Sequence, residues 1–116
     1  MAAEKKFVIR SKIWIADEED NVVFGEGRYR ILEAVDRLSS LQAAANELKM
    51  SYRALWGRIK ASEARIGRAL VAREGRGSRL TPFAQHLMEQ YRELHARILH
   101  ESDIVYARLF AESLDQ

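Results

Sequence analysis

The stretch that decides the fold runs from Leu38 to Trp56 and reads LSSLQAAANELKMSYRALW. Its first half repeats apolar residues at helical spacing, which predicts a helix over residues 40–49. The predicted buried face of that helix holds Leu41, Ala44, Ala45 and Leu48. Ser39 and Gln42 match a capping box at its start. The three alanines at 43–45 are small enough to let a neighbouring helix cross closely.

A second helix follows in the same stretch, with Ser51 as its predicted N-cap and an end near Gly67. At 100° per residue, one face collects residues that we expect to be buried: Leu55, Ile59, Ser62 and Ile66. The opposite face collects Arg53, Trp56, Gly57 and Lys60, and Tyr52 lies at the border between the two. This helix therefore presents two cations, an aromatic ring and a position without a side chain to its surroundings.

Downstream, the sequence LVAREGRGSRLTP over residues 70–82 predicts a small hairpin followed by a helix start. Glu74-Gly75-Arg76-Gly77 forms the expected tip, and Thr81-Pro82 combines an N-cap with proline at the first helical position. The last predicted helix, over residues 82–112, carries a long apolar stripe: Phe83, Leu87, Tyr91, Leu94, Ile98, Val105 and Leu109. It runs unbroken to about Ala111 or hinges near Ser102-Asp103.

Upstream, the pattern predicts one more helix and one more hairpin. From Arg28 the apolar residues Ile31, Leu32, Val35 and Leu38 recur at helical spacing, and this helix should stop near Ser39. Residues 7–15 and 22–24 are rich in β-branched and aromatic residues, with a turn-like acidic segment between them. We therefore assign residues 1–25 to a β-hairpin.

The composition bounds the class of protein. The chain has 116 residues and no Cys, which favours a single domain and excludes disulfides, thiolate metal sites and cysteine nucleophiles. No run approaches the roughly 20 apolar residues that span a bilayer, and the N-terminus lacks the continuous apolar core of a signal peptide. We expect a cytoplasmic protein without a membrane partner.

The charge is concentrated in the middle of the chain. Residues 52–82 hold 8 basic and 2 acidic residues, although the whole chain has a net charge of only +2. Seven of those eight cations are arginine, which can clamp phosphate or guanine through two parallel hydrogen bonds. A basic centre between acidic flanks is either a footprint for a polyanion or a solvated basic face.

The order of elements resembles a winged helix-turn-helix, a mainly α fold with a small amount of β structure. In this layout the helix after the tight turn enters the major groove of double-stranded DNA, and the hairpin serves as a wing. The expected DNA-binding residues are Ser51, Tyr52, Arg53, Trp56, Lys60, Arg76 and Arg79. This hypothesis requires that Arg53 and Lys60 are free of intramolecular ion pairs and that Trp56 is not fully enclosed.

Other interpretations remain open for several of these side chains. Trp56 is also compatible with a place at the edge of the core, and Tyr52 with a hydrogen bond inside the domain. Three further arginines lie off the outward face and are expected to be solvated: Arg58, Arg65 and Arg68. His86, Glu89 and Glu93 share a helix face, but no further ligand type accompanies them, so we predict no metal site, no cofactor and no enzymatic activity.

The stripe on the last helix is longer than a small domain is expected to cover. We therefore predict a twofold homodimer whose interface includes Leu87, Tyr91, Leu94 and Ile98. Such a dimer would read a roughly palindromic operator with half-sites about 34 Å or a multiple apart.

The motifs AAA at 43–45, Ser51-Tyr52-Arg53-x-x-Trp56 and LVAREGRGSRLTP are similar to those of one known family. Residues 28–94 resemble the N-terminal DNA-binding domain of molybdenum-dependent (ModE-like) transcriptional regulators and, more distantly, the head of LysR-type regulators. The resemblance implies a homodimeric transcription regulator that dimerises through long helices, with a link to molybdate or tungstate metabolism.

The chain departs from the ModE-like pattern in three ways. The wing is short, Lys49 stands where many helix-turn-helix proteins have glycine, and residues 83–116 leave no room for an oxyanion-binding domain. We therefore expect no oxyanion ligand. The alternative function is a protein-interaction module that uses the same fold to partner a separate regulator.

Overall fold

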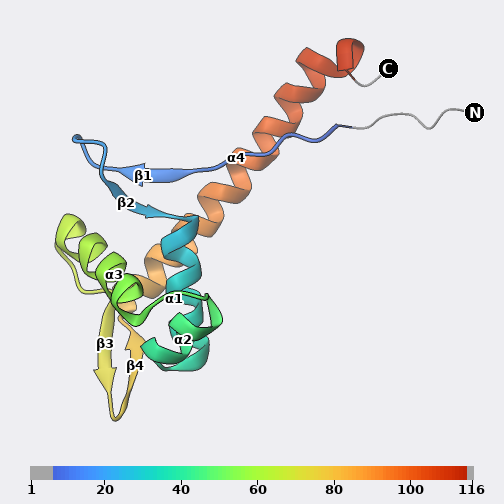
Figure 1. Ribbon diagram of the computed structural model, residues 1–116. Helices are drawn as coiled ribbons and strands as arrows, with labels where there is room; N and C mark the ends of the chain where they lie inside the picture. Colours follow the sequence, from blue (N-terminus) through green and yellow to red (C-terminus); the bar gives the residue numbers. More distant parts are fainter. Residues whose placement is uncertain (1–6, 115–116) are drawn as a thin grey trace, which may run out of the picture.

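The computed structural model describes residues 7–114 and confirms the predicted fold class (Figure 1). The elements are β1 (Trp14–Ala16), β2 (Val22–Gly25), α1 (Glu26–Leu38), α2 (Leu41–Glu47), α3 (Tyr52–Ile66), β3 (Val71–Glu74), β4 (Gly77–Leu80) and α4 (Pro82–Leu114). Each pair of strands forms its own antiparallel hairpin. In Figure 1 the β3–β4 hairpin projects from one end of the head, the β1–β2 hairpin lies at the other end, and α4 extends away from both.

The core lies where α1, α2 and α3 meet the inner ends of the strands. Its fully buried side chains include Phe24, Leu32, Val35, Leu55, Ile59, Leu70 and Leu80. Ala44 and Ala45 are also completely buried, which agrees with the predicted inner face of α2, and Ala43 is half-buried. Burial of Leu55, Ile59 and Ser62 confirms the predicted inner face of α3.

The turn between α2 and α3 is tight. Lys49 adopts the left-handed conformation with φ of 57°, and the Met50 amide donates a hydrogen bond of 2.9 Å to the carbonyl of Ala45. A non-glycine residue in this conformation costs roughly 1 kcal/mol relative to glycine. Packing of the two helices offsets that cost, so the departure from glycine at Lys49 leaves the turn intact.

The predicted capping box is wrong by one residue. Ser39 is the left-handed C-cap of α1, and Ser40 is the N-cap of α2, because its hydroxyl accepts a hydrogen bond of 3.1 Å from the Ala43 amide. The helix α1 also begins at Glu26 rather than at Arg28. Ser39 and Ser40 are adjacent, so the sequence alone does not show which serine ends α1 and which begins α2.

The N-terminal hairpin is shorter than predicted. The strand β1 is Trp14–Ala16, so only residues 14 and 15 of the predicted strand 7–15 lie in the sheet, and residues 1–6 of the predicted hairpin lie outside the described residues. The segment before β1 is instead tied to α4, because the Tyr91 hydroxyl donates a hydrogen bond of 2.8 Å to the carbonyl of Ile13. The residues just before β1 are therefore held by a side chain of α4 and not by pairing with another strand.

The helix α4 runs without a hinge to Leu114, so of the two predicted courses the unbroken one is confirmed. Its first part packs on the head: Phe83 and Leu87 contact the core, and Tyr91 is 6% exposed. The head thus covers Phe83, Leu87 and Tyr91, and the prediction is wrong for these residues. Leu94, Val105 and Leu109 are exposed, as predicted. Within residues 7–114 we find no helix long and apolar enough to cross a membrane.

Candidate nucleic-acid interface

The first turn of α3 is built to present its backbone amides outward. Ser51 caps the helix through a hydrogen bond of 3.0 Å from the Ala54 amide to its hydroxyl. The helix geometry leaves the amides before Ala54 without intrahelical partners, and the helix dipole places partial positive charge at the same point. Ser51, Tyr52 and Arg53 are all exposed here. An anionic group such as a phosphate therefore finds donors and favourable charge at this end of α3.

Arg53 and Lys60 lie on the same face of α3 but differ in their surroundings. Arg53 is exposed, and no ion pair involves it within residues 7–114. Lys60, by contrast, places its Nζ 3.0 Å from Glu63 Oε1 and 4.5 Å from the centroid of the Trp56 ring. The expectation that Lys60 is free of intramolecular ion pairs is therefore wrong, whereas Arg53 meets it.

Glu63 explains why Lys60 is held. Its other carboxylate oxygen accepts hydrogen bonds from the amides of Leu70, at 2.7 Å, and Val71, at 3.3 Å. Burial raises the pKa of Glu63, but these two amides and the Lys60 ammonium together outweigh it and hold the pKa below its ordinary value. The carboxylate thus joins the end of α3 to the start of the wing and attracts the lysine as well.

A groove separates α3 from the wing. It has a volume of about 470 Å³ and is lined by Ser40, Leu41, Gln42, Tyr52, Trp56, residues 71–73 and residues 76–78. Trp56 is half-buried at its wall and packs against the core, so it is neither fully enclosed nor freely exposed. Tyr52 is 44% exposed at the same wall. Both aromatic residues thus line the groove between the two basic elements.

The wing carries three exposed arginines in different positions. Arg76 lies at the tip, next to Gly75 with φ of 59°. Arg79 lies 3.8 Å from Glu74 through its Nε, and it does not line the groove. Arg73 does line the groove, opposite Ser78 in the strand register. The sequence analysis did not select Arg73, and strand alternation would not have singled it out, because Val71, Ala72 and Arg73 all line the groove.

The remaining arginines of the basic segment, Arg58, Arg65 and Arg68, are exposed as predicted, but two of them also contact other elements. Arg65 donates a hydrogen bond to the carbonyl of Val22, and the Arg68 guanidinium lies 4.5 Å from the centroid of the Phe83 ring. Arg58 is exposed. Arg65 thus links α3 to β2, and Arg68, just after the end of α3, contacts α4.

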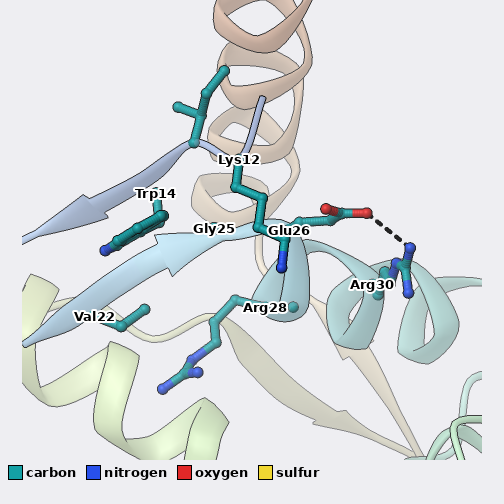
Figure 2. A pocket seen from close by; sticks show the side chains of 9 residues that line it. Lys12, Trp14, Val22, Gly25, Glu26, Arg28 and Arg30 are labelled. Atoms are coloured by element: carbon teal, nitrogen blue, oxygen red, sulfur yellow. Dashed lines mark hydrogen bonds and ion pairs between the residues drawn. The ribbon is translucent and has the colours of Figure 1, made fainter. Parts of the chain in front are cut away.

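A second basic hollow lies at the start of α1 (Figure 2). Its lining includes Lys12, Trp14, Arg28 and Arg30, and Arg30 is paired with Glu26 at 2.8 Å. Burial lowers the pKa of Arg28, and the positive charges of Arg58 and Arg65 lower it further. Arg28 Nε donates a hydrogen bond of 3.3 Å to the buried Ser62 hydroxyl. Arg28 thus has a structural role that fixes α3 on α1.

Beyond Tyr91, α4 exposes most of the remaining apolar stripe, and Ile98 is half-buried. The exposed apolar residues beyond the head are Leu94, Val105, Leu109, Phe110 and Leu114. Four residues lie within 60° on one face of the helix: Leu94, Ile98, Val105 and Leu109. Leu87 and Tyr91, the other two expected dimerisation residues, are packed on their own head. Among residues 7–114, no group of His, Cys, Asp or Glu has the arrangement of a metal site.

Comparison with known proteins finds a family that the sequence matches and solved structures with a similar fold. Residues 27–85 match the model of the bacterial regulatory helix-turn-helix protein, lysR family. The molybdenum transport protein ModE of Azotobacter vinelandii is 30% identical over 98 residues, which is 80% of this chain. The chain spans 36% of the length of that relative.

The similar solved structures are LysR-type regulators. The DNA-binding domain of CbnR in complex with DNA superposes with a TM-score of 0.57 at 26% identity, over 71% of this chain and 94% of that one. The DNA-binding domain of BenM with its benA site 1 DNA gives a TM-score of 0.56 at 20% identity, over 72% and 94%. The second likeness concerns the fold alone.

Proposed function

This chain belongs to the lysR family of bacterial regulatory helix-turn-helix proteins, and from that membership we propose that it binds double-stranded DNA to regulate transcription. The observation that carries the proposal is the exposed Arg53, which has no ion pair among the described residues, beside the amides of the first turn of α3. In the proposed complex α3 lies in the major groove, Ser51 and the helix amides hold a phosphate, and Arg53 reaches base edges. A regulator of this kind acts in the cytoplasm, where bacterial DNA is found.

The wing contributes contacts to the DNA backbone in this proposal. Arg76 at the tip grips phosphate or enters the minor groove, and Arg73 faces the same duplex from the groove wall. Tyr52 and Trp56 meet the sugar-phosphate wall between the two elements. Lys60 and Arg79 contribute less than free cations would, because each lies beside a carboxylate of its own chain.

We further propose that the chain acts as a homodimer through the far half of α4. The helix has 33 residues and is therefore about 50 Å long, of which the head covers only the first part. The face formed by Leu94, Ile98, Val105 and Leu109 gives a second copy an apolar seam. A twofold dimer would then bind a roughly palindromic operator with half-sites about 34 Å or a multiple apart.

The relative from Azotobacter vinelandii is named for molybdenum transport, and we propose that the genes regulated here concern molybdate or tungstate. Calorimetric titration of the 116-residue chain with sodium molybdate should give no binding heat, because the anion is not expected to bind the head itself. Micromolar binding would contradict that part of the proposal. Genome-wide mapping of the bound DNA would identify the genes.

Titration of a fluorescent duplex at increasing salt tests DNA binding. Several phosphate contacts should make the logarithm of the association constant fall linearly and steeply with the logarithm of the salt concentration. A flat dependence would overturn the proposal and favour the protein-interaction module.

A further inference from the structure

Gly57 lies in the interior of α3, on the face that carries Arg53 and Lys60. It is the sixth of the 15 residues of the helix and is exposed. Arg53 precedes it by one helical turn, and Lys60 follows it by three residues. Gly57 is therefore a gap in the side-chain cover of the helix, between two cations.

Nothing in the described part of the chain, residues 7–114, requires glycine at this position. A Cβ atom added to Gly57 would meet no atom within 4 Å, and its φ is not positive. Four other glycines have structural reasons: Gly67 and Gly75 have positive φ, and a Cβ at Gly25 or Gly77 would lie less than 3 Å from a neighbouring atom. The fold explains those four glycines and leaves Gly57 unexplained.

Glycine in a helix interior also destabilises the helix relative to alanine. Gly27 is the other glycine with open space around it, but it lies in the first turn of α1. Gly57 thus weakens the middle of an exposed helix without a benefit inside the chain. The benefit must come from a molecule that approaches this face.

We propose that Gly57 is a specificity-determining position, at which the absence of a side chain lets the duplex approach the backbone of α3 more closely than a larger residue would permit. This inference rests on the proposed DNA binding. The close approach seats the helix deeper in the major groove and brings Arg53 within reach of base edges. A larger residue at this position would hold the helix away from the bases while leaving the phosphate contacts of the wing in place.

The test compares Gly57→Ala and Gly57→Leu with Gly27→Ala, which is the matched control in another helix. The probe is the duplex that wild-type protein selects from a random-sequence library, together with a random duplex of equal length. Fluorescence anisotropy gives the Kd for each, and circular dichroism gives the helix content and the melting temperature. All three variants should fold, and Gly57→Ala should melt at or above the wild-type temperature because alanine favours the helix.

We expect Gly57→Leu to raise the Kd for the selected duplex about tenfold or more and to change the Kd for the random duplex much less. Gly57→Ala should show a smaller loss of the same kind, and Gly27→Ala should bind like wild type. Unchanged affinity of a folded Gly57→Leu variant would overturn this inference and leave DNA binding standing. Failure of the wild-type protein to select any duplex would overturn the proposed function and this inference together.

Discussion

The Ser78 amide in the wing donates a hydrogen bond of 3.0 Å to the carbonyl of Ser39, the residue that ends α1. The approach is so close that a Cβ atom on the neighbouring Gly77 would lie 2.4 Å from the same carbonyl oxygen. The left-handed conformation of Ser39, with φ of 55°, turns this carbonyl toward β4. The wing is therefore fixed to the scaffold at the start of β4, next to its tip, and Arg76 keeps a defined position relative to α3.

Gly77→Ala should destabilise the domain by about 1–3 kcal/mol, because the added methyl group forces β4 away from Ser39. Urea denaturation measures the loss. Gly27→Ala is the control, since its added methyl group meets open space. Equal stability of the two variants would show that the wing does not depend on this contact.

Glu63 should make stability fall in acid. Its pKa is lowered in the folded chain, so its contribution is present above the ordinary value near 4.5 and is lost as the pH falls through the folded pKa. Glu63→Gln should cost about 1–2 kcal/mol at pH 7 and should flatten the decline in stability below about pH 4.5. Thermal unfolding from pH 7 to pH 3 measures both effects, and an unchanged decline in the variant would contradict this role of the carboxylate.

Arg53→Ala and Arg76→Ala should weaken DNA binding in different ways. Arg53→Ala should cost about 1–3 kcal/mol on the selected duplex and little on random DNA, because Arg53 reads bases in the proposed complex. Arg76→Ala should weaken binding to both and lower the salt slope by about 1, since Arg76 contacts phosphate in that proposal. Equal losses for Arg53→Ala on the two duplexes would refute base reading.

Lys60→Ala should reduce DNA affinity less than Arg53→Ala does, because Glu63 and the Trp56 ring already hold the lysine. Its ammonium would have to leave both partners before it could contact a phosphate. Titrations of the two variants under the same salt conditions measure the difference. A loss as large as that of Arg53→Ala would mean that DNA binding releases Lys60 from its ion pair.

Leu109→Asp should convert the proposed dimer to a monomer, because it introduces a charge into the apolar face of α4 on which that proposal depends. Ala107→Asp is the control, since it lies on the opposite side of the helix and is also exposed. Tyr91→Phe should remain dimeric but lose about 1 kcal/mol of stability with its hydrogen bond to Ile13. Sedimentation separates the three results, and a dimeric Leu109→Asp variant would place the interface elsewhere.

The local patterns of the sequence determined the order of the helices and the wing. Apolar residues at helical spacing form a single face that can be buried. Leu55 and Ile59 therefore point inward, Ser62 lies on the same face, and Arg53 points outward. Likewise, Gly75 and its neighbours favour a hairpin tip, and Thr81-Pro82 favours the start of α4. These features depend on neighbours within a few residues, which is why a single sequence suffices to predict them.

Tertiary structure alone decided which side chains are free to act. Glu63 holds Lys60 because the wing brings the amides of Leu70 and Val71 to its carboxylate, a contact that spacing along α3 does not specify. Tyr91 is buried because Phe24 and Ile13, far away in the sequence, reach it. Such contacts depend on how separate elements pack, and periodicity within one element carries no information about its neighbours.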